Sequence, residues 1–384
     1  MKFTDTYGHT PVEKAFEQGD VYGVAHDAAR AARKPIRLGM IGAGGVAQSK
    51  YFPAVARLRT IWEPVTIAAF AEPREDHGRK VESIYGGHWY KDYANMLASE
   101  ALDGVLVLSP DHLHTEHTLA ALNAGCDVLV EKPITRSLAD ATRLCEAAEA
   151  AGRVLMTVAN KRYSPPYRRA HQAIREGAIG WPALFSGKFN LGYAYVDLLE
   201  SGTIHLFDLA LFLMGPVAAV SAAATKQPNS TLPYPFDNAA VTLRFVSGAV
   251  GSLITSATAL SLKPWERVEV YGDHAWLSVE DQEELRLYLS ETGGAESWRP
   301  VVPNTLLFDE EFGGYMGIIE NFVQAIRGAE QPLVTGRDGL RAYELLSAVH
   351  LSLACGEWVS LPLDPESADE EVNRWLAAAR NSRS

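Results

Sequence analysis

The sequence is poor in cysteine, and its few cysteines stand far apart. Cys126, Cys145 and Cys355 are the only three in 384 residues, and no two of them form a Cys-x-x-Cys pair. This spacing argues against a disulfide framework and against a cysteine-based zinc site, so we predict no metal centre. A reducing cytoplasm is the location that we expect for such a chain.

Long apolar runs and an excess of basic residues are also missing. No uncharged apolar stretch reaches the roughly 18 residues that span a bilayer, so we expect no membrane partner. Acidic residues outnumber basic ones by 47 to 35, and the formal net charge is -12. Because a nucleic-acid groove needs a clustered basic face, we expect no nucleic-acid partner. Residues 1–34 lack the apolar segment of a secretory signal, and we interpret them as an arm that includes a short helix at 24–33.

The overall composition is that of an ordinary globular protein, with 47% apolar and 21% charged residues. At about 150 residues per domain, the length corresponds to two or three domains, and we expect two. The expected divisions are an N-terminal extension at residues 1–34, a nucleotide-binding domain at 35–159, a second domain at 160–363 and a charged tail at 364–384.

The most informative segment joins an apolar strand, residues 36–41, directly to a glycine turn. Gly42 permits the tight turn, Gly44 lets the backbone approach a diphosphate, and Ala47 lets the next helix lie close to the sheet. The N-terminus of that helix offers free N–H groups and the positive end of a dipole to the phosphates. A glycine turn without any ligand is the alternative interpretation.

An acidic residue at the end of the next strand supports a dinucleotide site. Residues 65–71 form the continuous apolar run of a buried parallel strand, and Glu72 follows it. A carboxylate there accepts hydrogen bonds from ribose hydroxyls and repels a 2′-phosphate, which favours NAD. Arg74 favours NADP instead, because a guanidinium can bind that phosphate. We therefore expect NAD as the cofactor, with NADP as the alternative. For Glu72 itself, the alternative is a solvated charge at the end of a strand that binds no ligand.

Strands and helices alternate up to about residue 160. Predicted helices at 115–124 and 138–151 each end at a glycine, and the apolar strands around them lie at 104–108, 127–130 and 154–158. Alternation of this kind predicts right-handed crossovers and a doubly wound parallel sheet of the Rossmann type. Ligands bind outside the carboxyl ends of the strands in such sheets. The residues that we expect around one crevice are Gly42, Glu72, Ser109, Lys132 and Asn160.

After residue 160 the pattern changes to that of antiparallel strands. Valine, threonine, phenylalanine and glycine mix in residues 182–191 and 238–258, and a hairpin is expected at 268–277. Helices are expected at 167–176, 315–327 and 336–356. The second domain should therefore be rich in sheet and closed by helices.

Two groups of residues have the types and spacing that acid–base chemistry needs. Lys132 follows a predicted parallel strand, and partial burial near a cationic ring would lower the pKa of its ammonium. Pro133 restricts the backbone beside it. His205 and Asp208 lie one helical turn apart, so Asp208 can orient the imidazole or bind a substrate hydroxyl. The structural alternatives are that Lys132 is a surface lysine in a turn and that His205 is a core histidine hydrogen-bonded to a neighbour.

Several motifs occur together in one order along the chain. They are Gly42-Ala43-Gly44-Gly45-Val46-Ala47, Ser109-Pro110-Asp111-His112-Leu113-His114, Ala121-Leu122-Asn123-Ala124-Gly125, Glu131-Lys132-Pro133 and His205-Leu206-Phe207-Asp208. From about residue 36 to residue 363 the chain resembles the glucose-fructose oxidoreductase, inositol dehydrogenase and rhizopine catabolism (Gfo/Idh/MocA) family. The resemblance implies an N-terminal Rossmann domain, a C-terminal α+β domain with an open, mostly antiparallel sheet, and a nicotinamide cofactor. It also implies a sugar, cyclitol or related polyol as substrate and, by analogy, a homodimer or homotetramer.

The resemblance also assigns roles to individual residues. It implies that Lys132 and His205 are the catalytic acid and base. It places four residues at the substrate: Asp208, Arg162, Tyr163 and Ser201. A structural hinge between the domains is the alternative for Arg162 and Tyr163. Together with the strand-end argument it gives these cofactor-binding residues: Gly42, Ala43, Gly44, Gly45, Val46, Glu72, Arg74, Ser109, Pro110, His114, Glu131, Lys132 and Asn160.

The sequence departs from the family pattern just before the histidine. Many members carry an aspartate four residues before it, where this chain has Ser201, and a glycine two residues before it, where this chain has Thr203. The proton relay then runs through Lys132 and His205 alone or recruits Glu200 or Asp197. Substrate choice is expected to rest on side chains of the second domain, including Trp265, Tyr315 and Tyr195.

Taken together, the motifs predict an NAD(P)-dependent oxidoreductase that moves a hydride between a nicotinamide cofactor and a secondary alcohol or ketone. One alternative is an NAD-dependent glycosidase or lyase, in which a bound cofactor oxidises the substrate only transiently. A second alternative is a nucleotide-sensing regulator without turnover. The presence of Lys132, His205 and Asp208 together argues against the regulator, because a sensor needs none of them.

Overall fold

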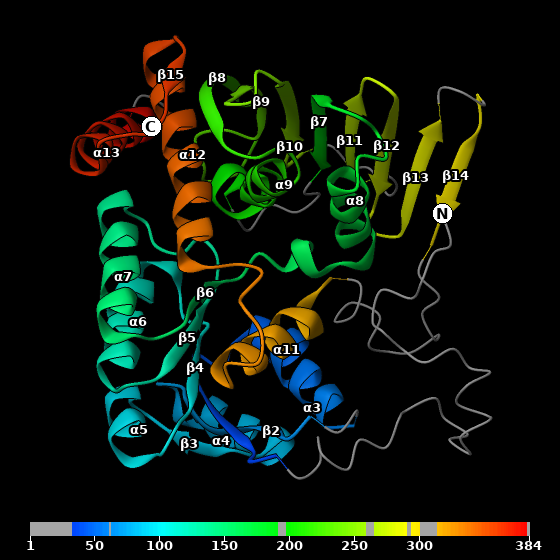
Figure 1. Ribbon diagram of the computed structural model, residues 1–384. Coiled ribbons are helices and arrows are strands. Elements are labelled where there is room, and N and C mark those ends of the chain that lie inside the picture. The colour runs from blue at the N-terminus through cyan, green and yellow to red at the C-terminus, as the bar shows by residue number, and fades with distance from the viewer. Residues whose placement is uncertain are drawn as a thin grey trace, which may run out of the picture.

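The computed structural model describes residues 33–60, 63–190, 197–258, 265–289, 293–299 and 313–381. The expected helix at 24–33 falls outside these ranges except for its last residue, and Tyr195 also lies outside them. Two sheets, one N-terminal and one C-terminal, are joined by helices that pack between them (Figure 1). The predicted fold class is confirmed. No helix in the described ranges is long and apolar enough to cross a membrane.

The N-terminal sheet is parallel and has six strands in the order β3-β2-β1-β4-β5-β6. Its strands are β1 (Ile36–Ile41), β2 (Val65–Ala71), β3 (His88–Tyr90), β4 (Gly104–Val107), β5 (Asp127–Val130) and β6 (Leu155–Thr157). Every residue of β4, β5 and β6 is buried, as expected for a parallel sheet with helices on both faces. The strand order reverses between β1 and β4, and this switch point is where doubly wound sheets bind ligands.

Helices connect these strands, and the predicted ones at 115–124 and 138–151 are present, whereas α4 and the strand β3 were not predicted from the sequence. They are the π-helical turn η1 (Ala47–Tyr51), α3 (Phe52–Thr60), α4 (Glu75–Tyr85), α5 (Tyr93–Ser99), the 3-10 turn η2 (Asp111–Leu113), α6 (His114–Asn123) and α7 (Leu138–Ala151). The hydroxyl of Ser137 caps α7 by accepting a hydrogen bond from the backbone N–H of Asp140, and Gly152 ends the helix in a left-handed conformation.

The C-terminal sheet has nine strands in the order β14-β13-β12-β11-β7-β10-β9-β8-β15. Its strands are β7 (Pro182–Asn190), β8 (Val217–Thr225), β9 (Asn238–Phe245), β10 (Val250–Ser256), β11 (Glu266–Gly272), β12 (Ala275–Glu280), β13 (Glu284–Leu289), β14 (Ala295–Trp298) and β15 (Val359–Ser360). Strands β7 and β10 run parallel, so the expectation of antiparallel strands is wrong for this pair. All other neighbouring strands of the sheet are antiparallel.

The alanine-rich strand β8 was not predicted from the sequence. Alanine has a low β propensity, and pairing with β9 over most of its length imposes the extended conformation. Tertiary context therefore overrides local preference here.

The helices after residue 160 include those that carry residues of the pocket described below. They are the 3-10 turn η3 (Asn160–Tyr163), α8 (Pro165–Arg175), the π-helical turn η4 (Leu198–Thr203), α9 (Ile204–Met214), α11 (Tyr315–Ile326) and α12 (Gly336–Cys355). Helix α12 packs against β8 and α9 of one half and against α7 and β6 of the other, so it joins the two (Figure 1). Helix α11 returns to the N-terminal half and packs against α3.

The C-terminal segment differs from the charged surface segment that the sequence suggested. Residues after Asp364 form α13 (Pro365–Asn381), which packs against α7 and α12 and buries Ala368 and Val372. The carboxylate of Asp369 accepts hydrogen bonds from the Ser137 hydroxyl at 2.7 Å and from the Leu138 backbone N–H at 2.8 Å. The segment therefore docks on the N-terminus of α7, where a negative charge is favourable.

Candidate active site

A pocket lies where the carboxyl ends of β5 and β6 meet α9 and α12. Its lining residues are Lys132, Pro133, Ile134, Thr157, Val158, Ala159, Ile204, His205, Asp208, Gly339 and Ala342. The first six of these follow or end strands of the parallel sheet, and the other five come from the two helices. The structure thus brings Lys132, His205 and Asp208 into one pocket, although 76 residues separate the first from the last.

Lys132 crosses the boundary between the two halves. Its Nζ donates a hydrogen bond to the backbone carbonyl of Ser201 at 2.8 Å, and its backbone N–H donates to Glu131 Oε2 at 2.9 Å. Burial lowers the pKa of the Lys132 ammonium, and the charges of Glu131 and Asp111 oppose that shift. A lysine with a lowered pKa can take up and release a proton closer to neutral pH than a surface lysine.

His205 is the second residue of α9 and faces the same pocket. Burial lowers its pKa well below the ordinary value, and the charges of Lys132 and Lys161 lower it further. No hydrogen bond joins its ring to another group in the part of the chain that the structure describes. A neutral imidazole in the pocket wall is therefore available to a ligand.

Asp208 lines the pocket and is held from behind by Arg162. The Nε and Nη2 atoms of Arg162 donate to Asp208 Oδ1 at 3.0 and 2.7 Å. The guanidinium also contacts Asp338 Oδ1 at 3.3 Å, near the start of α12. Burial raises the pKa of Asp208, and the Arg162 charge opposes that rise. Arg162 thus joins η3, α9 and α12. Because it pairs with Asp208 and does not line the pocket, we expect it to hold Asp208 in place and not to contact a substrate directly.

Residues 197–203, where the sequence departs from the family pattern, make hydrogen bonds within the protein. Ser201 offers its backbone carbonyl to Lys132, as described above. The Thr203 hydroxyl is fully buried and donates to the Leu198 carbonyl at 2.9 Å. Asp197 caps η4 by accepting from the backbone N–H groups of Leu199 and Glu200. The group that accepts a hydrogen bond from the Lys132 amine in this segment is therefore a backbone carbonyl, that of Ser201.

The glycine turn after β1 has the shape that a diphosphate needs. Gly42 has φ = +97°, and a Cβ at this position would lie 2.7 Å from the Leu108 carbonyl oxygen, so only glycine fits. A Cβ on Gly44 or Gly45 would meet nothing within 4 Å. The Ala43 carbonyl accepts a hydrogen bond from Gln48 Nε2 at 2.9 Å. The open side of the turn therefore fits a diphosphate approaching the free N–H groups of the helix that follows.

Glu72 and Arg74 form a pair at the end of β2. Glu72 is buried, and its Oε1 accepts hydrogen bonds from the Arg74 Nε at 2.9 Å and from the Arg74 backbone N–H at 3.3 Å. This hydrogen bond and the Glu72 charge raise the pKa of Arg74. The structure therefore holds the Glu72 carboxylate at the carboxyl end of β2 with the Arg74 guanidinium bonded to it, and its contact with an adenosine ribose stays a prediction.

Other predicted cofactor residues bond to the protein around the crevice. The ring nitrogens of His114 lie 2.8 Å from the Pro133 carbonyl and 2.9 Å from the Ser109 carbonyl, which ties the loops after β4 and β5 together. Glu131 Oε1 accepts a hydrogen bond from the buried Tyr51 hydroxyl at 2.8 Å. Pro110 is exposed at the tip of its loop. These contacts give His114 and Glu131 a loop-positioning role in this structure.

The remaining predicted residues lie at different places. The side-chain amide of Asn160 donates to the Gly313 carbonyl, and its buried Oδ1 has no hydrogen-bond partner among the described residues. The Tyr163 hydroxyl donates to Asn321 Oδ1 at 2.7 Å in the core beside α11, and Tyr163 does not line the pocket. Val46 is exposed beside the glycine turn. Trp265 and Tyr315 do not line the pocket either, because one packs on Lys161 and the other on Tyr51.

Sequence reasoning missed several residues of the site. Thr157, Gly339 and Ala342 line the pocket, and Lys161 lies buried behind it in contact with Glu266. Lys161 had a signal, since it directly precedes Arg162 in a segment already singled out. Glu266 and Gly339 had none, because they are distant in sequence and reach the site only through the sheet and α12.

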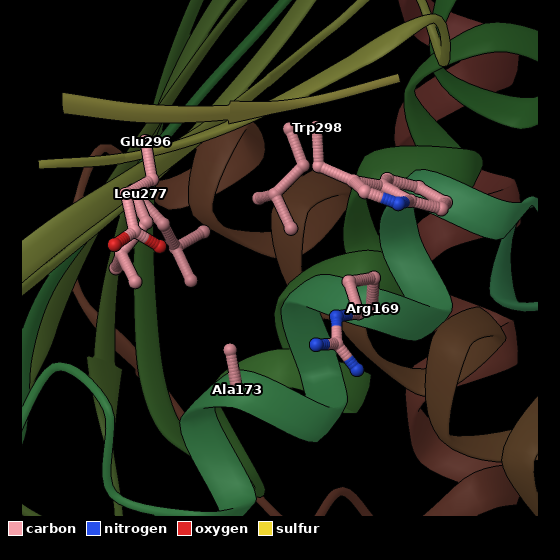
Figure 2. A pocket seen from close by; sticks show the side chains of 7 residues that line it. Arg169, Ala173, Leu277, Glu296 and Trp298 are labelled. Atoms are coloured by element: carbon pink, nitrogen blue, oxygen red, sulfur yellow. The ribbon is translucent and has the colours of Figure 1, made fainter. Parts of the chain in front are cut away.

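A second hollow lies elsewhere, between α8 and the strands β12 to β14 (Figure 2). Its lining is mostly apolar and consists of Arg169, Ala173, Leu277, Leu285, Leu287, Glu296 and Trp298. Arg169 Nη1 donates a hydrogen bond to Gln172 Oε1 at 2.9 Å. The hollow shares no residue with the pocket around Lys132, and we interpret it as a packing gap at the edge of the sheet.

Two family models match this chain. The model described as "Oxidoreductase family, NAD-binding Rossmann fold" matches residues 36–159, and the model described as "Oxidoreductase family, C-terminal alpha/beta domain" matches residues 198–361. The chain belongs to this Gfo/Idh/MocA oxidoreductase family. Its NAD-binding fold is the sheet that carries the glycine turn, and its pocket lies between the two matched regions.

Similar proteins from this family have related names. The chain is 28% identical to myo-inositol 2-dehydrogenase of Thermotoga maritima, over 83% of this chain and 96% of that protein. It is 30% identical to D-apiose dehydrogenase of Paraburkholderia graminis, over 71% of this chain and 76% of that protein. A structure of levoglucosan dehydrogenase with NADH and levoglucosan superposes with a TM-score of 0.78 at 20% identity, covering 86% and 100% of the two chains, and supports the same fold.

The glycine turn can be tested by two alanine substitutions with opposite expectations. Gly44→Ala places a methyl group in the open space of the turn, so NADH should bind at least about tenfold more weakly while the protein stays folded. Gly42→Ala forces a clash with the Leu108 carbonyl at a positive φ, so it should lower the melting temperature even without cofactor. Fluorescence titration with NADH and a thermal melt measure the two effects. Undiminished NADH binding by Gly44→Ala would contradict the assignment of this turn.

Proposed function

We propose that this protein is an NAD-dependent dehydrogenase or reductase that acts on a secondary alcohol or the matching ketone of a sugar, cyclitol or related polyol. The observation that carries the proposal is the meeting of Lys132 and His205 in one pocket at the carboxyl edge of the NAD-binding sheet. The names of the similar proteins support the polyol class and favour net hydride transfer over the glycosidase, lyase and regulator alternatives.

The residues around the crevice fit a dinucleotide. The backbone of Gly44 and Gly45 would hold the diphosphate, and Glu72 would accept hydrogen bonds from the adenosine ribose. The nicotinamide ring supplies the chemistry of accepting or returning a hydride. Arg74 is already bonded to Glu72, which supports NAD over NADP, because a 2′-phosphate would have to compete with that carboxylate.

The protein's own part of the reaction is the movement of one proton at the substrate oxygen. In oxidation, the uncharged Lys132 amine takes the hydroxyl proton while the carbinol carbon loses its hydride, so that a C=O bond forms. In reduction, the Lys132 ammonium returns the proton to the carbonyl oxygen. His205 stays neutral because its pKa is lowered well below the ordinary value, and it orients the hydroxyl by a hydrogen bond. Asp208, fixed by Arg162, accepts a hydrogen bond from a neighbouring hydroxyl.

A substrate panel tests this proposal. Purified protein with NAD and a set of cyclitols, aldoses and sugar lactols should produce NADH with at least one compound, and the ketone product should be detected by mass spectrometry. NADP should support a lower kcat/KM than NAD. Release of a cleaved or dehydrated sugar without net NADH would favour the glycosidase or lyase instead, and tight NAD binding without turnover of any compound would contradict the proposal.

The proton-transfer role of Lys132 predicts a pH dependence. Since oxidation needs the uncharged amine, kcat/KM should rise with pH along a limb whose apparent pKa lies below the ordinary lysine value of 10.5. His205 is already neutral over that range and should add no limb there. Lys132→Met should reduce kcat by about 10²- to 10⁴-fold and remove the limb, with NADH affinity kept. A variant that retains turnover and the limb would remove Lys132 from the mechanism.

We also propose that copies of this chain pair through the open face of the nine-stranded sheet, in a reducing cytoplasm. Leu184, Val250 and Ile254 are 38%, 46% and 62% exposed on that face, and Leu184 and Val250 are register partners on β7 and β10. The thiols of all three cysteines are free, which suits a reducing compartment.

Sedimentation velocity measures the assembly. The native protein should sediment as a dimer or tetramer, because neighbouring apolar side chains on an open sheet face favour association. Ile254→Glu should shift it toward the monomer without changing its melting curve in dilute solution. A native protein that sediments as a monomer at micromolar concentration would contradict this assembly.

A further inference from the structure

One side chain of the pocket has a polar atom that makes no hydrogen bond to the protein. Thr157 is 4% exposed, and its Oγ1 has no hydrogen-bond partner among the described residues. An unpaired buried hydroxyl destabilises the folded protein, because it has lost its hydrogen bonds to water. Other buried side-chain atoms in the described ranges share this state, and they belong to Thr118, Asn160, Ser164, Arg267 and Gln282, none of which lines the pocket. The Thr157 hydroxyl therefore indicates a hydrogen-bond partner from outside the chain.

The fold places this hydroxyl at the pocket wall that β6 and α12 share. Thr157 is the last residue of β6 and pairs with Val130 of β5, two residues before Lys132. A Cβ built on Gly339 of α12 would lie 2.2 Å from Thr157 Oγ1, the nearest atom that it would meet. Thr157 and Gly339 both line the pocket. The absence of a side chain on Gly339 thus leaves room for the hydroxyl at the edge of the pocket.

The other polar groups of the pocket have hydrogen-bonding capacity left. The ring of His205 makes no hydrogen bond within the described part of the chain. Asp208 accepts three hydrogen bonds from Arg162, and a carboxylate has about four acceptor sites. Lys132 Nζ donates to one carbonyl, although an ammonium has three hydrogens. The rest of the lining is apolar. The pocket therefore offers donors and acceptors together in apolar surroundings.

This mixture of groups fits a neutral hydroxyl. A hydroxyl has one hydrogen to donate and two lone pairs to accept with, so it can bond to Thr157 and to a second group at once. A carboxylate or a phosphate dianion has no hydrogen to donate and would bring negative charge beside Asp208. An aliphatic group would leave the Thr157 hydroxyl unpaired. A hydroxyl of this kind is carried by a polyol or by a water molecule.

We propose that Thr157 is a substrate-binding residue, whose hydroxyl forms a hydrogen bond with a hydroxyl group of the polyol other than the one that is oxidised. This inference rests on the proposed function and adds a requirement to it, because the substrate must carry that second hydroxyl. A compound that lacks it leaves the Thr157 hydroxyl unpaired, and sites of this kind reject such compounds strongly. Water has the same hydrogen-bonding chemistry, and its presence at Thr157 in place of the polyol is the outcome that the test must separate.

Thr157→Val tests the contact, because valine has nearly the shape of threonine and lacks the hydroxyl. No hydrogen bond within the protein is lost, so the melting temperature of the free protein should stay the same or rise. NADH affinity and the pH limb assigned to Lys132 should be kept. The KM for the polyol should rise about tenfold. Thr157→Ser, which keeps the hydroxyl, should recover most of that loss, and Thr157→Ala replaces Thr157→Val if that variant does not fold.

Thr118→Val is the matched control. Thr118 lies on α6, is 0% exposed and also has a hydroxyl without a partner among the described residues, but it does not line the pocket. Its replacement should likewise leave the melting temperature unchanged or raise it, and it should leave KM and kcat as they are. A similar rise of KM in both variants would mean that the loss of a buried hydroxyl acts through the fold, and it would overturn the assignment of Thr157.

Deoxy analogues of the polyol give a readout that a purely structural role would not change. The analogues each lack one hydroxyl of the compound that turns over in the substrate panel. For one of them the native protein should lose about tenfold or more in kcat/KM, and Thr157→Val should lose nothing further with that analogue. If the native protein and Thr157→Val show the same preference for the polyol over every analogue, the inference is overturned.

Binding in the presence of NADH separates this contact from turnover. With NADH bound no hydride can be accepted, so calorimetric titration with the cyclitols and aldoses of the panel measures binding alone. A polyol that binds the native protein and binds Thr157→Val about tenfold more weakly supports the contact. Lack of turnover then counts against the proposed function and not against the contact.

The remaining outcomes are also decisive. Equal Kd and KM values for the native protein and Thr157→Val overturn the inference and leave the proposed function standing if the polyol is oxidised. A crystal structure of the polyol complex with a water molecule, and no polyol oxygen, at the Thr157 hydroxyl assigns this position to solvent and overturns the inference. If no compound of the panel binds or turns over, the proposed function fails and the inference fails with it.

Discussion

The buried contact among Arg162, Asp208 and Asp338 is the constraint on which the pocket depends. It joins η3, which continues from the last strand of the parallel sheet, to α9 and to the start of α12. The side chains of Arg162 and Asp208 are 6% and 8% exposed, and removing one partner from such a pair costs about 3–5 kcal/mol. This cost is large compared with the stability of a domain, so the two halves are held in a defined relation and the pocket between them has fixed walls.

With that relation fixed, the chemistry of the pocket follows from burial and from the sign of nearby charges. Lys132 reaches across from the end of β5 to a backbone carbonyl of η4, while His205 starts α9 beside it. A carbonyl holds a lysine in place without adding the full negative charge that would raise its pKa. The site therefore combines a desolvated amine, a neutral imidazole and a carboxylate already neutralised by arginine, which suits the exchange of one proton with a hydroxyl oxygen.

Much of the architecture was predictable because local patterns and the topology agree. The parallel sheet follows from continuous apolar strands that alternate with helices ending at glycines, and Gly42, Glu72 and Lys132 then lie at the carboxyl edge of that sheet. Other features were not readable. Strand β8 is rich in alanine and is extended only because it pairs with β9, and strands β7 and β10 lie parallel only because the intervening helix and strands return the chain to that position.

The sequence by itself determined the NAD-binding fold and the glycine turn, because each depends on residues close together in the chain. It also predicted the amine of Lys132 and the imidazole of His205, which line one pocket in the structure. Only the tertiary structure decided which side chains face the ligand and which face one another. Arg162 turns to Asp208, Glu131 to Tyr51 and Lys161 to Glu266, and each of these partners lies 46 or more residues away. A charge that becomes buried when the elements pack needs a partner, because an unpaired buried charge is unfavourable. The partner is distant in the sequence, so a local pattern of residues cannot predict it.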